Sequence, residues 1–77
     1  MTKNWPNAMP PELLHRDGTI ALKPSRLRHL GQETNVLLKI LKKAMKKGEQ
    51  EFTLAANLIA TQYEVAVREV YTLWYSP

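Results

Sequence analysis

Polar and apolar positions follow a helical period over residues 33–47. At about 100° per residue, one face gathers apolar side chains and the opposite face gathers lysines. The apolar face consists of Leu37, Leu38, Ile40, Leu41, Ala44 and Met45. Lysines crowd the last turn and Gly48 follows them, which is typical of a helix C-terminus. The pattern therefore predicts an amphipathic helix over residues 33–47.

A second helical region is predicted from a cap at Thr53 to about residue 75, and it can be interpreted in two ways. In one interpretation it is a single helix, because apolar residues recur at alternating spacings of four and three. This series is Phe52, Ala56, Ile59, Tyr63, Ala66, Val70 and Leu73. In the other interpretation the helix breaks at Tyr63 and Glu64. The β-branched residues between Val65 and Val70 disfavour an uninterrupted helix and favour the break.

The broken form resembles the helix-turn-helix motif of bacterial and phage regulators. In that motif a small residue precedes the turn, and branched apolar residues follow at fixed spacings. Ala60, Val65, Val70 and Leu73 fit this pattern, whereas Glu64 stands where the motif has glycine. Residues 30–75 are then similar to a trihelical DNA-binding domain. The same helix-loop-helix-turn-helix order occurs in the DNA-binding ends of phage replication initiators. The resemblance implies that Arg68 and Thr72 contact base edges.

The first twelve residues contain three prolines, which fix the backbone and remove hydrogen-bond donors. We therefore predict an extended arm over residues 1–12. Trp5 and Met9 on this arm can pack back onto the core or dock onto a partner. Asp17 and Gly18 then form a favoured two-residue turn between apolar segments, which predicts a short β-hairpin.

The predicted fold class is mostly α, in a single small domain over residues 13–77. A short N-terminal β-hairpin is followed by a trihelical, helix-turn-helix-like domain. The alternative is a two-helix hairpin with a long C-terminal helix, whose overhanging apolar seam would pair in a dimer. The predicted core consists of Leu37, Leu41, Met45, Leu58, Ile59, Val70 and Leu73.

Charge is distributed unevenly along the chain, which has a net charge of +4. Residues 1–48 carry ten Lys or Arg and three acids, whereas residues 49–77 carry one Arg and four Glu. The predicted helix over residues 33–47 bears five lysines in one arc of roughly 140°, without an interleaved acid. These are Lys39, Lys42, Lys43, Lys46 and Lys47, and Arg26 and Arg28 precede them. Such density creates a coherent positive field that suits phosphates or an acidic protein surface.

Neither catalysis nor metal or cofactor binding is expected. The chain has no cysteine and only two histidines, His15 and His29, which lie far apart. Its three glycines are isolated, so no glycine-rich phosphate loop is present. No apolar run approaches the roughly 20 residues that a membrane-spanning helix needs, and the first residues do not resemble a signal peptide. We therefore expect a cytoplasmic protein that binds another macromolecule.

Two hypotheses about function follow. The first is a small helix-turn-helix-type transcription regulator that binds DNA, or the transcription machinery, through its basic helix. The second is a protein-binding modulator of phage or plasmid type, an inhibitor that docks on a larger host enzyme such as RNA polymerase. Tyr71 and Tyr75, spaced four apart, could contribute to such a contact together with the arm. The expected partner is DNA or an acidic protein surface, and the protein itself is a monomer or homodimer.

Overall fold

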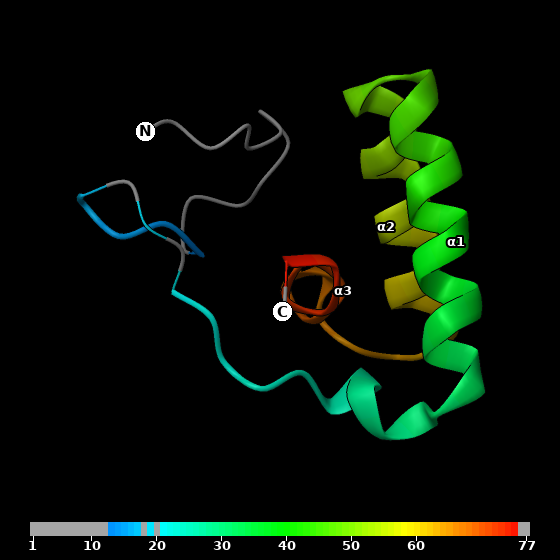
Figure 1. The fold of residues 1–77 in the computed structure, drawn as a ribbon, viewed down its shortest axis with the longest axis horizontal. Helices are drawn as coiled ribbons and strands as arrows, with labels where there is room; N and C mark the ends of the chain where they lie inside the picture. Colours follow the sequence, from blue (N-terminus) through cyan, green and yellow to red (C-terminus); the bar gives the residue numbers. More distant parts are fainter. Residues whose placement is uncertain (1–12, 18, 20, 76–77) are drawn as a thin grey trace.

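The computed structural model describes residues 13–17, 19 and 21–75. A short 3-10 helix, η2 (Arg26–Leu30), precedes three α-helices: α1 (Gln32–Lys47), α2 (Glu49–Gln62) and α3 (Val67–Tyr75). Figure 1 shows α1 and α2 side by side as a helical hairpin, while α3 is seen end-on and so lies across them. The described part of residues 13–25 lies on the other side of α3. The third helix is therefore enclosed between the hairpin and this segment.

The first two helices are joined by a single residue, Gly48. Its φ of 126° and ψ of 166° place it in a region that only glycine occupies readily. The Gly48 carbonyl accepts the first hydrogen bond of α2 from the Phe52 amide, at 3.1 Å. The predicted start of this helix at Thr53 is wrong, because α2 already begins at Glu49. The Thr53 hydroxyl instead donates to the Glu49 carbonyl within the helix, at 2.9 Å.

A Schellman-type turn separates α2 from α3. The Val65 amide donates to the Ala60 carbonyl at 3.0 Å, and the Glu64 amide donates to the Thr61 carbonyl at 3.3 Å. Glu64 has a φ of 52°, the left-handed conformation that this turn requires. The break expected at Tyr63 and Glu64 is therefore present. The alternative of one long C-terminal helix is wrong.

The predicted β-hairpin is wrong, and with it the predicted fold class. In the described part of residues 13–25, Leu14 takes part in an isolated β-bridge, but no strand is formed. Two backbone hydrogen bonds close a loop, from His15 to Thr19 and from Ala21 to Leu13, each 2.7 Å long. The Asp17 carboxylate accepts from both the amide and the hydroxyl of Thr19, which favours a local turn. A two-stranded ribbon is marginal in water, and the chain instead buries Leu13 in the core.

The start of η2 is tied to α3 by a cluster of polar contacts. Ser25 caps η2 by accepting from the Leu27 amide, and its hydroxyl also donates to the Glu69 carbonyl, at 3.1 Å. The Glu69 carboxylate accepts from the amide and from the Nε of Arg26, at 2.8 Å each. Partial burial raises the pKa of Glu69, but the hydrogen bonds from Arg26 outweigh it and lower the pKa below its ordinary value. The ionised Glu69 therefore holds η2 against α3.

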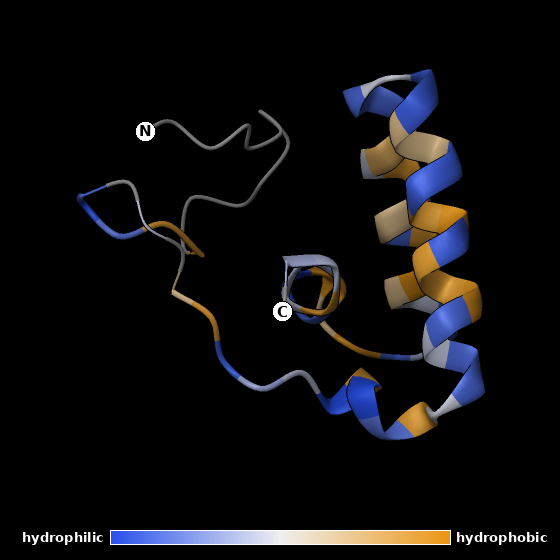
Figure 2. Ribbon diagram, viewed as in Figure 1, coloured by the Kyte–Doolittle hydropathy of each residue, from blue (hydrophilic) through white to orange (hydrophobic). Residues whose placement is uncertain are grey.

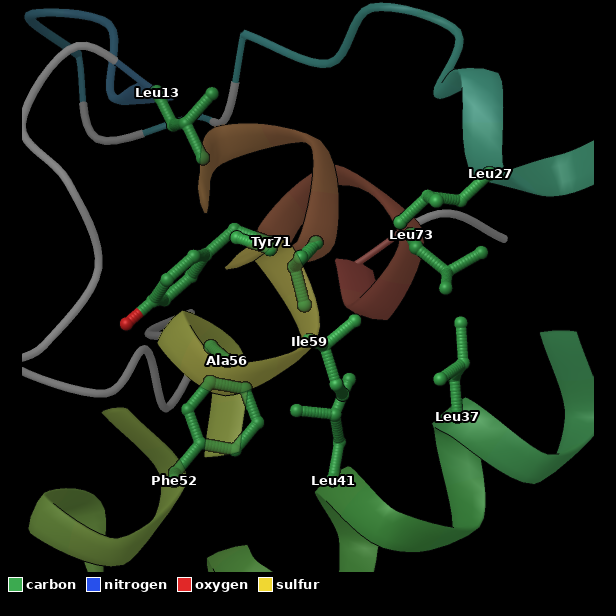
Figure 3. Close-up of a cluster of buried hydrophobic side chains, with 11 residues drawn as sticks. Leu13, Leu27, Leu37, Leu41, Phe52, Ala56, Ile59, Tyr71 and Leu73 are labelled. Atoms are coloured by element: carbon green, nitrogen blue, oxygen red, sulfur yellow. The ribbon is translucent and has the colours of Figure 1, made fainter. Parts of the chain in front are cut away.

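The core lies where α3 meets the hairpin. Figure 3 shows Leu37 and Leu41 from α1 meeting Ile59 from α2, with Leu13 on the far side of α3. The Phe52 ring packs edge-on against Tyr71, at 5.6 Å between ring centroids, and lies 5.1 Å from Trp74. The buried apolar residues are Leu13, Leu27, Leu37, Leu41, Phe52, Ala56, Ile59, Ala60, Val70, Tyr71 and Leu73.

Most of the predicted core residues are buried, with two exceptions. Leu37, Leu41, Ile59, Val70 and Leu73 are confirmed. Met45 is only partly buried. Leu58 is 60% exposed, because α2 turns the face of Phe52, Ala56 and Ile59 toward α3.

Candidate functional site

Five lysines form a continuous exposed surface on α1, which we call the lysine face. Its members are Lys39, Lys42, Lys43, Lys46 and Lys47, and all of them are exposed. Figure 2 shows how hydrophilic and hydrophobic positions alternate along α1, as the amphipathic pattern predicts. From Lys39 to Lys47 the face extends over about 12 Å, at about 1.5 Å per residue.

The lysine face is not neutralised by neighbouring acids. None of its lysines forms an ion pair within the described part of the chain. The acid of α1, Glu33, lies in the first turn and accepts a hydrogen bond from the Tyr63 hydroxyl, at 3.1 Å. That hydrogen bond and partial desolvation raise the pKa of Tyr63. The positive charges of the face therefore remain available to an external anion.

The two arginines of η2 are exposed, but they differ in their surroundings. The Nε of Arg26 lies 2.8 Å from Glu69, so its charge is largely engaged in holding η2. Arg28 is exposed beside it, close to the start of α1. Of the basic residues predicted to bind an anion, five gather on one face of α1 as the lysine face, and the two arginines lie on η2.

The central part of the third helix does not present an exposed surface that could contact the base edges of DNA. Val70, Tyr71, Thr72 and Leu73 are consecutive and all buried. At about 100° per residue, four consecutive positions point in every direction around a helix, so this part of α3 has no free face. The Thr72 side chain is 5% exposed, and its hydroxyl donates to the Arg68 carbonyl at 2.8 Å. A contact between Thr72 and a base edge does not fit this placement.

Arg68 is exposed, but it lies away from the lysine face. It lines a pocket with Leu13, Lys23 and Ser25, on the side of α3 that faces residues 13–25. In Figure 1 the hairpin of α1 and α2 lies on the opposite side of α3 from this segment. Arg68 and the lysines were predicted to act on the same partner, but the fold separates them.

The residues predicted to dock a partner are placed as follows. Tyr71 is 1% exposed and belongs to the core, so it does not contribute to a surface patch. Tyr75 is half-buried, and its burial raises its pKa strongly. Trp5 and Met9 lie outside the described residues, as does the whole predicted arm.

An apolar groove that the sequence pattern did not predict lies between α1 and α2, with a volume of about 330 Å³. Its lining residues are Ile40, Lys43, Ala44, Lys47, Glu51, Leu54, Ala55 and Leu58. Leu54 and Leu58 are spaced four apart on α2, opposite the buried Phe52. The sequence contained this signal, because α2 has more apolar positions than one buried face can hold.

In the part of the chain that the structure describes, no three His, Cys, Asp or Glu side chains gather where they could hold a metal ion. Over the same residues, no helix has the length and apolar character needed to cross a membrane. Both histidines are exposed. Comparisons of the chain with protein-family models, curated proteins and solved structures found no match.

Proposed function

We propose that this protein is a DNA-binding domain of the regulator type and that it binds duplex DNA through the lysine face of α1. The observation that carries the proposal is the exposure of five lysines on one helix, without a paired acid in the described residues. Protein–protein interfaces are depleted in lysine, whereas phosphate contacts rely on lysine and arginine. A surface built from lysine alone therefore suits a phosphate backbone better than it suits another protein.

The proposed binding mode is contact with the backbone rather than reading of bases. In helix-turn-helix proteins the second helix of the motif enters the major groove, and its side chains contact base edges. The helix at that place here is α3, whose middle four residues are buried. The lysine face supplies compact point charges, and it lacks the planar fork of arginine and the side-chain amides of Asn and Gln that pair with base edges. We therefore expect little preference among sequences.

The experiment is a titration of a short DNA duplex with the protein at several salt concentrations. Fluorescence anisotropy of the labelled duplex measures binding. Each lysine–phosphate contact contributes about −0.9 to the slope of log K against log salt. The variant Lys39→Ala/Lys42→Ala/Lys46→Ala should therefore have a slope about 2.7 units shallower than the native protein. Its affinity should fall alike for unrelated sequences.

A matched control removes three positive charges from elsewhere. The variant Arg16→Ala/Lys23→Ala/Arg68→Ala has the same net charge, but it changes exposed residues outside α1. It should keep nearly the native slope. Equal losses in both variants would mean that only net charge matters. The absence of binding at about 50 mM salt, where nonspecific affinity is high, would reject the proposed function.

A second candidate function is a protein-binding modulator. One observation favours it, the apolar groove of Ile40, Leu54 and Leu58 beside the lysine face. Such a modulator could act on the transcription machinery or on another large enzyme. The residues that line this groove indicate which kind of partner it would bind.

A further inference from the structure

The groove between α1 and α2 brings several exposed apolar side chains together, whereas exposed apolar residues on a protein surface are usually scattered singly. Ile40 is 45% exposed, and Leu54 and Leu58 are 61% and 60% exposed. All three line the same groove, together with Ala44 and Ala55. Contiguous apolar surface with a polar rim is typical of an interaction site.

The arrangement of these side chains fits a helix. Ile40 and Ala44 are one turn apart on α1, and Leu54 and Leu58 are one turn apart on α2. The two rows thus form parallel ridges with a furrow between them. A third helix can lay its own ridge into such a furrow, with apolar residues at spacings of three and four.

The charges on the rim select the partner. Lys43 and Lys47 line the α1 side of the groove, and Glu51 lines the α2 side near one end. From Phe52 to Tyr63, α2 carries no charged residue. A helix in the groove would therefore meet two cations along the α1 edge, whereas the α2 edge is uncharged beyond Glu51. A second copy of this chain is a poor occupant, because it would bring two lysine faces close together.

We propose that the groove between α1 and α2 binds an amphipathic helix of a partner protein, one that carries Asp or Glu along one edge. Its apolar ridge contacts Ile40, Leu54 and Leu58, and its acidic edge lies over Lys43 and Lys47. This surface shares Lys43 and Lys47 with the lysine face, whereas Lys39, Lys42 and Lys46 do not line the groove. Variants outside the shared pair test the two functions separately: Lys39, Lys42 and Lys46 for DNA, and Leu54 and Leu58 for the partner helix.

The test uses three synthetic peptides of about 14 residues, roughly four helical turns. The first has leucine on one face and glutamate along one edge. The second has lysine in place of that glutamate, and the third is a scrambled form of the first. Each is titrated into the isotope-labelled full chain, and amide shifts and affinity are measured by NMR. The acidic peptide should shift the amides of Ile40, Ala44, Leu54 and Leu58, and the other two peptides should bind more weakly.

Two variants examine the two parts of the proposal. The variant Leu54→Ala/Leu58→Ala should weaken binding of the acidic peptide by about tenfold or more. The variant Lys43→Glu/Lys47→Glu should reverse the preference, so that the lysine peptide binds more tightly than the acidic one. All four positions are exposed, so both variants should fold, which circular dichroism and thermal melting verify.

The matched control is Lys39→Ala/Lys46→Ala, which removes two lysines outside the groove and should leave peptide affinity within about twofold. The Leu54→Ala/Leu58→Ala variant should still bind duplex DNA, which separates this proposal from the proposed function. The proposal is overturned if the acidic peptide fails to bind at millimolar concentration, or if it binds the leucine variant as tightly as the native protein. A dimer in sedimentation that the leucine variant abolishes would overturn it as well, because a second copy would then fill the groove.

Discussion

The helices α1 and α3 differ in how they use their surfaces. Over its 16 residues α1 buries only Leu37 and Leu41, and its lysines point outward. Over its nine residues α3 buries four in succession, Val70–Leu73. Hydrophobic residues on one stripe make a helix that covers the core, whereas burial on every side makes a helix that the core surrounds. The pattern of exposure is therefore the reverse of that in a helix-turn-helix regulator, where the last helix of the motif presents the exposed contact surface.

The difference has an energetic consequence. The side chains of α3 contact α2, α1 and η2, and Leu13 lies on the side of α3 away from the hairpin. A substitution in α3 therefore affects packing against several elements at once, whereas a substitution on the lysine face removes no contact with the core. We expect stability to depend mainly on α3 and binding to depend mainly on α1.

The largest expected effect is at the centre of α3. Tyr71→Ala should lower the free energy of unfolding by about 3–5 kcal/mol, because it leaves a cavity beside Phe52. A domain of this size is stable by about 4–11 kcal/mol, so the variant should be largely unfolded in mild urea. The comparison is Lys42→Ala on α1, which should cost less than about 0.5 kcal/mol. Similar urea midpoints for the two variants would contradict the division of roles.

The next effect concerns the link that holds α1 against α2. Gly48→Ala should lower the free energy of unfolding by about 1–3 kcal/mol, because alanine is strained at this φ and ψ. A Cβ at Gly48 would meet no atom within 4 Å, so the cost comes from the backbone alone. Lys47→Ala, the neighbouring helical position, is the control and should be close to neutral. Thermal or urea unfolding followed by circular dichroism measures both.

A smaller effect links α3 to η2 through pH. Because the pKa of Glu69 is lowered in the folded protein, its ionised form adds stability above the ordinary pKa of about 4.5. That contribution is lost as the pH falls through the lowered pKa. Glu69→Gln should therefore lower the free energy of unfolding by about 0.5–1 kcal/mol at neutral pH and leave it almost unchanged near pH 2.

The control for this prediction is Glu51→Gln, which removes an exposed carboxylate from α2. Urea unfolding at several pH values compares both variants with the native protein. An equal pH dependence for the native protein and Glu69→Gln would show that the contact with Arg26 contributes nothing.

The smallest effect is at the entry to α3. Glu64→Gly should change the free energy of unfolding by less than about 1 kcal/mol, and in the stabilising direction. Relief of the left-handed strain contributes about 1 kcal/mol, and the greater freedom of glycine in the unfolded chain offsets part of it. Gln62→Gly, two residues earlier and within α2, should instead destabilise by roughly 0.5–1 kcal/mol. Equal losses at both positions would place Glu64 in a continuing helix.

The sequence predicted those elements whose signals are local. The lysines and the glycine at the end of α1 mark its boundary within one residue, and the branched residues after Tyr63 mark the break. The start of α2 was missed because Gly48 both ends α1 and begins α2, so no separate cap exists at Thr53. The hairpin was wrong because a local turn at Asp17 does not reveal that Leu13 packs against α3.

The candidate site was predicted only in part, for a similar reason. The lysine face follows from helical geometry alone and lies on α1 as expected. Which faces of α2 and α3 are covered depends on contacts with distant segments, which no local pattern encodes. Leu58 was therefore assigned to the core and Thr72 to the surface, and the structure places both the other way round.

The one-residue link at Gly48 also bears on the order in which the chain folds. Closing a short loop costs less entropy than closing a long one, and contacts between sequence neighbours form fastest. The hairpin of α1 and α2 needs almost no loop, whereas the contact between Ser25 and Glu69 joins residues 44 positions apart. We therefore expect the hairpin to form before α3 is secured. Substitution of Leu41 should then slow folding, and substitution of Ser25 should mainly speed unfolding.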